Sequence, residues 1–188
     1  MPRLEDSGLT TSSDKMLVEA VFEGENAAFK ELYDRYAPLI RAVCFDTTGN
    51  LADAQDLAQD VFMRAFEKLE NLREPELFGR WLVAIARLRC KEWQRQISRT
   101  QKKHAGLSEN YAAANKQSND GQLELLRDKI RTLPIQERLA LHIFYLQENS
   151  ADDARKVLGL SRSGFYRVLE RARKNLAILL SKESQDVQ

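Results

Sequence analysis

Apolar residues recur at steps of three and four along nearly the whole chain of 188 residues, and this spacing restricts the fold more than any other feature. Such steps mark one face of an α-helix, whereas the alternation typical of strands is almost absent. The pattern is clearest in Phe29, Leu32, Tyr33, Tyr36, Ile40, Val43 and Cys44. We therefore expect an all-α fold of amphipathic helices.

The first half of the chain predicts four helices that pack into one bundle. The second helix is expected to kink at Pro38, and Asp53 is expected to open the third after a break at 47–50. A fourth helix is expected over 76–97. Besides the residues of the second helix, the inward positions are Leu17, Val18, Val21, Phe22, Leu57, Val61, Phe62, Phe66, Leu69, Phe78, Leu82, Ile85 and Trp93.

A polar segment interrupts the helical pattern at residues 98–122, where Ser, Thr, Gln, Asn and Lys dominate. As a flexible linker it would span on the order of 25–30 Å, enough to separate two small helical domains. We divide the chain into a disordered tail (1–13), a first domain (14–98), the linker (99–122), a second domain (123–182) and a C-terminal tail (183–188).

The end of the chain has the dimensions of a helix-turn-helix. Ser150 is expected to cap a short helix over 151–158, and Gly159 to form the turn after it. Ser161 is expected to cap a last helix that ends near Ser181.

Charge is divided unevenly along the chain, although the net charge is only +1. Residues 1–75 carry 15 Asp/Glu and 8 Lys/Arg, whereas residues 76–104 carry 2 Asp/Glu and 8 Lys/Arg. Residues 124–188 are also basic, with 12 Lys/Arg and 9 Asp/Glu. This asymmetry indicates two partners of opposite charge, one of them rich in phosphate.

Basic side chains gather on one face of two helices. In the fourth helix this face holds Arg80, Arg87, Lys91 and Arg95, with Trp81 and Leu88 beside them. Basic residues next to an aromatic side chain suit single-stranded or melted DNA. A solvated face with Trp81 in the core is the simpler interpretation.

The last helix divides in the same way, with an apolar stripe that includes Phe165, Leu169 and Ala172. A recognition helix needs this division, because one face anchors it while the other meets bases and phosphates. Arg167 is the best candidate for a base contact, and an ordinary solvated face is the alternative. The candidate DNA-binding residues of this helix are Arg162, Ser163, Tyr166, Arg167, Glu170, Arg171 and Lys174, with Arg173 a further candidate for phosphate contact.

The third helix carries an acidic stripe, because Asp53, Asp56 and Asp60 share one face. An acidic stripe repels DNA and suits a basic protein surface. The first two carboxylates could also simply complement the helix dipole. A Mg²⁺ site for diphosphate chemistry would need a second acidic cluster, and the sequence contains none.

Other chemistry has little support in the sequence. No apolar run approaches the roughly 20 residues of a membrane-spanning helix, and the polar N-terminus lacks a signal-peptide core, so we expect a cytoplasmic protein without membrane insertion. Cys44 and Cys90 are interpreted as two free thiols, and His104 and His142 lack ligand spacing, so no metal is expected. Without a nucleophile–base constellation or a Gly-rich phosphate loop, we expect neither enzyme activity nor a cofactor.

Several segments together resemble the extracytoplasmic-function (ECF) subfamily of the sigma-70 family of RNA polymerase sigma factors. AFKELYDRYAP (28–38), DAQDLAQDVFMRAF (53–66) and FGRWLVAIAR (78–87) resemble sigma domain 2. LPIQER (133–138), LGLS (158–161) and RARKNL (171–176) resemble sigma domain 4, the helix-turn-helix domain. Their order and spacing cover nearly the whole chain outside the linker and tails.

The resemblance implies a bacterial transcription initiation subunit that binds core RNA polymerase at the β′ clamp helices and the β flap, and that an anti-sigma factor could regulate. The linker would thread toward the RNA exit path, and the last helix would read the −35 element of promoter DNA. The implied polymerase contacts are Asp53, Asp56, Gln59, Asp60, Phe62 and Arg64. The implied contacts to unpaired −10 bases, with DNA melting, are Arg80, Trp81, Arg87, Leu88, Lys91 and Arg95.

The sequence departs from the family pattern at three places. Leu88 stands where asparagine is frequent, Arg155 where alanine permits close helix crossing, and Gly164 lies in the first turn of the recognition helix. These departures bear on promoter preference. A stand-alone helix-turn-helix regulator, which binds DNA without polymerase and usually as a dimer, is the alternative function.

Overall fold

The computed structural model describes residues 12–103, 121–146 and 151–186, and within these ranges it contains helices and no strand. The first domain comprises α1 (Asp14–Phe22), α2 (Asn26–Thr48), α3 (Leu51–Glu67) and α4 (Phe78–Lys103), with two 3₁₀ turns, η1 (Leu69–Asn71) and η2 (Pro75–Leu77), before α4. The second domain comprises α5 (Gly121–Thr132), α6 (Ile135–Leu146), α7 (Ala151–Leu158) and α8 (Arg162–Asp186). The predicted all-α class with two helical domains is confirmed.

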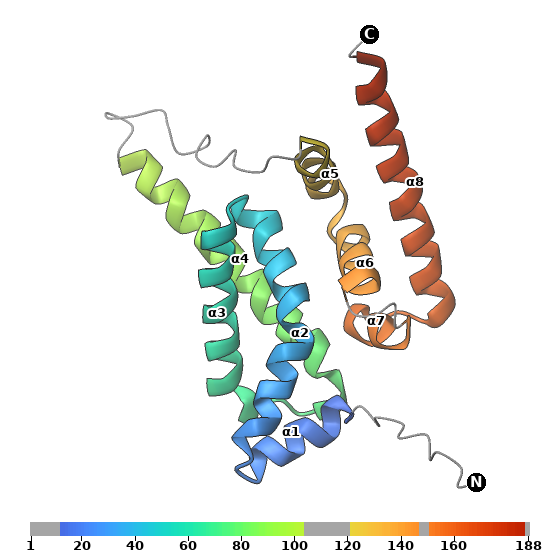
Figure 1. Cartoon of the computed structure of the whole chain (residues 1–188). Coiled ribbons are helices and arrows are strands. Elements are labelled where there is room, and N and C mark those ends of the chain that lie inside the picture. Colours follow the sequence, from blue (N-terminus) through green and yellow to red (C-terminus); the bar gives the residue numbers. More distant parts are fainter. Residues whose placement is uncertain (1–11, 104–120, 147–150, 187–188) are drawn as a thin grey trace, which may run out of the picture.

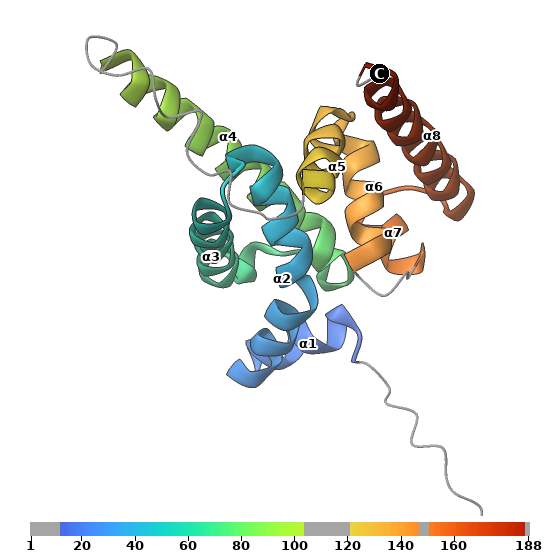
Figure 2. The ribbon, with the colours of Figure 1, turned by 45° about the horizontal axis from the view of Figure 1, so that its top comes forward.

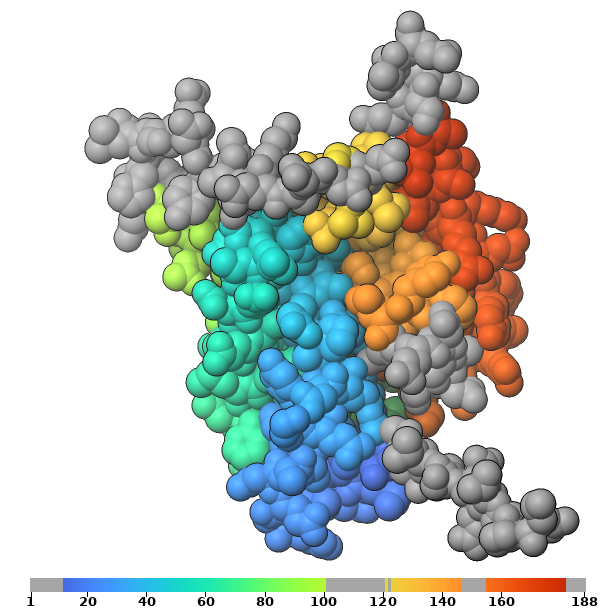
Figure 3. Space-filling model, in the orientation of Figure 1, coloured from blue at the N-terminus to red at the C-terminus, as the bar shows by residue number. Residues whose placement is uncertain are grey.

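Figure 1 shows α2, α3 and α4 side by side, with α1 across one end of the bundle. The second domain lies beside α2 and the first turns of α4, and the rotated view of Figure 2 shows the same order. In the space-filling view of Figure 3, α6 lies directly against α2. The two domains therefore contact each other rather than standing apart.

The fourth helix is longer than the sequence pattern predicts. The pattern places its end near Ile97, but α4 continues to Lys103. Arg, Gln and Lys, which make up most of the additional turn, are good helix formers despite their polarity. The rest of the expected linker and the expected cap Ser150 lie outside the described residues.

The start of the third helix differs from the prediction. Asn50, not Asp53, is the N-cap, because its side-chain oxygen accepts hydrogen bonds from the amides of Ala52 (2.8 Å) and Asp53 (3.1 Å). Gly49, with φ +67°, ends α2 in the left-handed conformation that favours glycine. The expected kink residue Pro38 lies inside α2, which runs without interruption from Asn26 to Thr48.

Three aromatic side chains expected in the core are exposed instead: Phe22, Tyr33 and Phe66. Phe66 packs edge-on against Phe29 with ring centroids 4.9 Å apart. Aromatic pairs between neighbouring helices at the surface follow the same three- and four-residue spacing as core residues. Periodicity alone therefore could not distinguish these exposed aromatic residues from buried ones.

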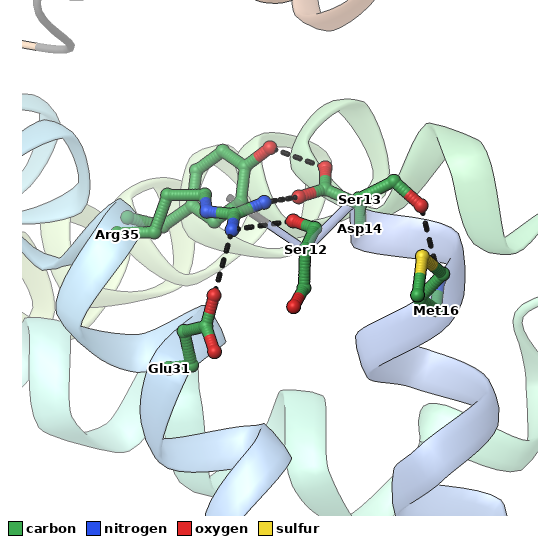
Figure 4. Close-up of polar contacts among 7 residues, drawn as sticks. Ser12, Ser13, Asp14, Met16, Glu31 and Arg35 are labelled. Carbon is green, nitrogen blue, oxygen red and sulfur yellow. Dashed lines mark hydrogen bonds and ion pairs between the residues drawn. The ribbon is translucent and has the colours of Figure 1, made fainter. Parts of the chain in front are cut away.

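A polar clasp joins α1 to α2 (Figure 4). Arg35 donates to Asp14 Oδ1 (2.7 Å) and to the carbonyl of Ser12 (2.7 Å), and Tyr36 donates to Asp14 Oδ2 (2.5 Å). Asp14 is part-buried, and both of its carboxylate oxygens accept a hydrogen bond. The clasp fixes the crossing of α1 over the bundle and orients the ring of Tyr36 toward α4.

Gly79 is buried where that ring meets α4. A β-carbon at Gly79 would lie 2.6 Å from Tyr36 Oη and 2.7 Å from Tyr36 Cε1, so substitution by alanine must displace the ring. We expect Gly79→Ala to destabilise the first domain by about 1–3 kcal/mol. Thermal unfolding should show a Tm lower by roughly 2–4 °C per kcal/mol.

Gly121→Ala is the matched control, since a β-carbon there meets nothing within 4 Å. Its effect should stay within the range of surface substitutions, about ±0.5 kcal/mol. Equal unfolding temperatures for the two variants would show that the packing of Tyr36 on Gly79 is loose enough to admit a methyl group.

Candidate functional site

The acidic stripe on α3 has exposed and half-buried members. Asp56 and Gln59 are exposed and Asp53 is half-buried. Met63 and Phe66, at the next steps of four and three, are also exposed. We call Asp56, Gln59, Met63 and Phe66 the α3 stripe: it is acidic toward the start of the helix and apolar toward its end.

Two members of the predicted polymerase contact have other roles. Phe62 is 4% exposed, and its ring centroid lies 4.5 Å from that of Tyr33. Phe62 therefore packs on the buried side of α3 and is not part of its exposed surface. Asp60 accepts from Arg89 of α4 and lies 3.4 Å from Arg64. The charges of Asp60 and Arg64 are therefore largely compensated within the domain.

Arg89 connects the acidic helix to the basic one. It also donates to Glu92, and although burial opposes its charge, the hydrogen bonds to Asp60 and Glu92 raise the pKa of Arg89. Arg87 and Lys91, which flank Arg89 in the sequence, lie on a separate, exposed face of α4.

That face agrees with the prediction from the sequence. Arg80, Arg87, Lys91 and Arg95 are exposed, and Leu88 is 54% exposed among them. Arg99 is exposed one further turn along α4 and extends the face beyond the predicted set. Trp81 is half-buried, with its ring centroid 6.0 Å from that of Phe78. Trp81 thus has a core side and a side that remains open to solvent.

Helix α8 begins at the predicted cap. Ser161 Oγ accepts a hydrogen bond from the amide of Gly164 (3.1 Å), and Gly159 has φ +66° in the turn before it. A β-carbon at Gly164 would lie 3.0 Å from Ser161 Oγ, so glycine lets the cap approach closely. The apolar stripe of α8 is buried at Phe165, Val168, Leu169 and Ala172.

The opposite face of α8 is exposed along its whole predicted length: Arg162, Ser163, Tyr166, Arg167, Glu170, Arg171 and Lys174. Lys174 pairs with Glu170 at 2.8 Å, and this hydrogen bond lowers the pKa of Glu170. Arg155 of α7 is half-buried.

Two arginines of α8 have structural partners that no pattern in the sequence predicts. Arg171 Nε donates to Glu137 Oε1 of α6 at 2.8 Å, and Asn175 donates to the other oxygen at 2.9 Å. Glu137 is 2% exposed. The guanidinium of Arg173 lies 5.0 Å from the ring centroid of Phe144. Arg171 and Arg173 therefore help to fix α8 on α6 while remaining exposed.

The two cysteine thiols, far apart in the sequence, lie next to each other in the fold. Cys44 and Cys90 are free and buried where α2 packs on α4, and the hydrogen bond between them together with burial raises the pKa of Cys44. Among the described residues no three His, Cys, Asp or Glu side chains gather as a metal site would require. No helix in the described ranges is both long and apolar enough to cross a membrane.

The comparisons with known proteins concern both domains. A family model, "Sigma-70 region 2", matches residues 32–100. The ECF RNA polymerase sigma factor BldN of Streptomyces coelicolor is 27% identical over 90% of this chain and 66% of its own length. The RNA polymerase sigma factor YlaC of Bacillus subtilis is 29% identical over 85% of this chain and 95% of its own length.

Two solved structures share the fold. CnrH, in complex with the cytosolic domain of CnrY, aligns with a TM-score of 0.58 at 20% identity, over 91% of this chain and 99% of that one. The sigma factor RpoE of Bartonella quintana, in complex with the anti-sigma factor NepR, aligns with a TM-score of 0.53 at 24% identity, over 81% and 96% of the two chains.

Proposed function

We propose that this chain, which belongs to the ECF subfamily of the sigma-70 family of sigma factors, binds core RNA polymerase, directs it to promoters with −10 and −35 elements and promotes DNA melting in the cytoplasm. It would act as a binding subunit rather than as an enzyme. The observation that carries the proposal is the separation of surfaces: an acidic and apolar stripe on α3, and exposed basic faces on α4 and α8.

The α3 stripe suits a protein partner with a basic, partly apolar surface. Asp56 offers an exposed carboxylate with no ion-pair partner among the described residues, whereas the neighbouring Asp60 is paired with Arg89. Met63 and Phe66 add exposed apolar area within the next two turns. Electrostatic steering by the carboxylate, followed by burial of the apolar side chains, is a common way to build such an interface. We assign this surface to the β′ clamp helices.

The exposed face of α4 suits the melted −10 strand. Arg80, Arg87, Lys91 and Arg95 would neutralise phosphates, while the open side of Trp81 offers a surface for an unstacked base. Leu88 lies among them and would supply an apolar contact in place of the amide hydrogen bonds of an asparagine. The base that contacts Leu88 should therefore be selected by its shape rather than by hydrogen bonds.

An anti-sigma factor is the proposed regulatory partner. RpoE was solved with an anti-sigma factor bound, and its chain aligns with 81% of this one. An inhibitor that covers the α3 stripe would compete directly with polymerase for the same surface.

Binding to polymerase tests the proposal most simply. The purified chain, mixed with bacterial core polymerase, should co-elute with it in size-exclusion chromatography. A chain that binds duplex DNA as a dimer and never co-elutes with polymerase would instead be a stand-alone helix-turn-helix regulator.

Promoter melting should depend on the exposed basic face of α4. The double variant Arg87→Ala/Lys91→Ala should reduce open-complex formation on a duplex promoter more than on the same promoter with a pre-melted −10 region, because these residues stabilise the separated strand. Permanganate reactivity of unpaired thymines would measure opening. Lys68→Ala/Arg73→Ala, which removes two exposed charges outside α4, is the control. An undiminished rate on duplex DNA would exclude Arg87 and Lys91 from the melting site.

Reading of the −35 element should depend on Arg167. Arg167→Ala should flatten the preference at a single −35 position, since the loss of a bidentate guanine contact costs roughly 1–3 kcal/mol. Lys174→Ala, four residues from its partner Glu170, should leave the profile unchanged. Selection from a library randomised at the −35 element would compare the profiles, and identical profiles for Arg167→Ala and wild type would contradict the assigned register.

A further inference from the structure

A cluster of charged side chains joins the two domains at the C-terminal end of α2. Asp46 of α2 has a side chain only 8% exposed. His142 Nε2 lies 3.1 Å from Asp46 Oδ2, and Arg138 Nε lies 3.5 Å from the same oxygen. Arg131 Nε donates to the backbone carbonyl of Asp46 at 3.2 Å. We call Asp46, Arg131, Arg138 and His142 the interdomain cluster.

The position of the cluster has a physical reason. The last turn of a helix exposes carbonyls that carry partial negative charge and favours basic side chains, but the last turn of α2 contains none of its own. Asp46 adds a full negative charge at that end. The second domain supplies the missing cations, and Arg127 of α5 also lies 5.5 Å from the ring centroid of Phe45.

A second contact lies at the other side of the interface. A β-carbon at Gly159, in the turn of the helix-turn-helix, would be 3.2 Å from the guanidinium carbon of Arg80 on α4. The turn that positions the −35 helix therefore touches the basic face assigned to the −10 strand. Arg80 and the polar face of α8 stay exposed, so the contact covers neither DNA-binding surface.

The closed arrangement is incompatible with a bound promoter. The −10 and −35 elements lie about 25 base pairs apart by their numbering, which is on the order of 85 Å along straight B-DNA at 3.4 Å per base pair. In the closed arrangement α7 packs against α4, and the turn at Gly159 lies so close to Arg80 that a β-carbon there would be 3.2 Å from its guanidinium carbon. Two elements that far apart cannot both be bound by domains in direct contact.

We propose that the interdomain cluster is a latch that holds the free protein in a closed, promoter-incompetent form and that opens when the protein joins polymerase. The inhibitory role rests on the proposed function, whereas the latch itself does not. Arg138 Nε is buried without a hydrogen-bond partner among the described residues, so its contact with Asp46 is ionic only. An interface with such an unsatisfied group is suited to opening.

Small-angle X-ray scattering of the full chain tests the latch without DNA or polymerase. The radius of gyration of the wild type should be near that of a compact chain of this length, about 16 Å. Asp46→Ala should raise it by about 5 Å or more, as expected when two bodies of about 90 and 65 residues separate. Asp34→Ala is the control, because it removes an exposed aspartate of the same helix that pairs with the exposed Lys30, and it should not change the radius.

A second variant guards against misfolding of the first. Arg131→Ala/His142→Ala removes two of the three side chains that the second domain contributes to the cluster and leaves Arg138 in place. Circular dichroism should show unchanged helix content for both variants. An unchanged radius of gyration in both would overturn the latch. If the closed form makes up about 90% of the free protein, opening should speed association with core polymerase by about tenfold.

The association rate decides the inhibitory role. An expanded variant that binds polymerase no faster than wild type would overturn autoinhibition. A wild-type chain that fails to bind polymerase at all would contradict the proposed function, and the scattering result would still decide whether the latch exists.

Discussion

Asp56→Lys is expected to weaken binding to core polymerase by about 10- to 100-fold, equivalent to about 1.4–2.8 kcal/mol. The substitution places a cation at the acidic end of the α3 stripe, where it would oppose a basic partner surface, and like-charge contacts across an interface are strongly unfavourable. Asp56 is exposed, so the helix itself should tolerate the change. Asp60 is unsuitable for this test because its reversal would set a third cation beside Arg64 and Arg89.

Fluorescence anisotropy of the labelled chain titrated with core polymerase would measure the effect. Asp34→Lys makes the same change in net charge on α2, where Asp34 is exposed, and should leave the affinity within about twofold. If Asp56→Lys binds as tightly as this control, the docking surface lies elsewhere on the molecule.

Arg171→Ala is expected to lower the free energy of unfolding of the second domain by about 3 kcal/mol. Removal of an ordinary exposed side chain should have a far smaller effect. The substitution leaves the buried carboxylate of Glu137 with Asn175 as its remaining described partner. A buried charge that loses its partner typically costs about 3–5 kcal/mol, and the partial exposure of Arg171 favours the lower end. The Tm should fall by roughly 2–4 °C for each kcal/mol.

Lys174→Ala provides the comparison, because its partner Glu170 is on the surface and such a pair contributes about 0.3–0.5 kcal/mol. Differential scanning calorimetry would resolve the two. Equal melting temperatures for Arg171→Ala and Lys174→Ala would mean that the contact between Arg171 and Glu137 does not stabilise the second domain.

Local sequence signals predicted much of the fold correctly. The three- and four-residue spacing indicated the helices, and the Gly159 turn with the Ser161 cap indicated the start of α8. These features depend on residues close together in the chain. The same holds for the basic face of α4, whose members all lie on one helix.

The sequence pattern gave wrong environments for residues whose surroundings depend on a second helix. Phe62 and Phe66 fit the same period, but only packing against α2 places the first inside and the second outside. Arg171 and Glu137 are 34 residues apart, and Asp46 and His142 are 96 apart. A single sequence contains no signal for such distant pairs, so the interdomain cluster could be found only in the folded chain.

If this protein gives core polymerase its choice of promoter, transcription from a randomised promoter library should show that choice. Core polymerase with the purified chain should yield transcripts whose templates share two sequence elements about 25 base pairs apart, centred near −10 and −35. Core polymerase alone should yield no such enrichment. Promoter selection by this chain would be contradicted if it adds no transcripts above those of core polymerase, or if the enriched templates share no spaced elements.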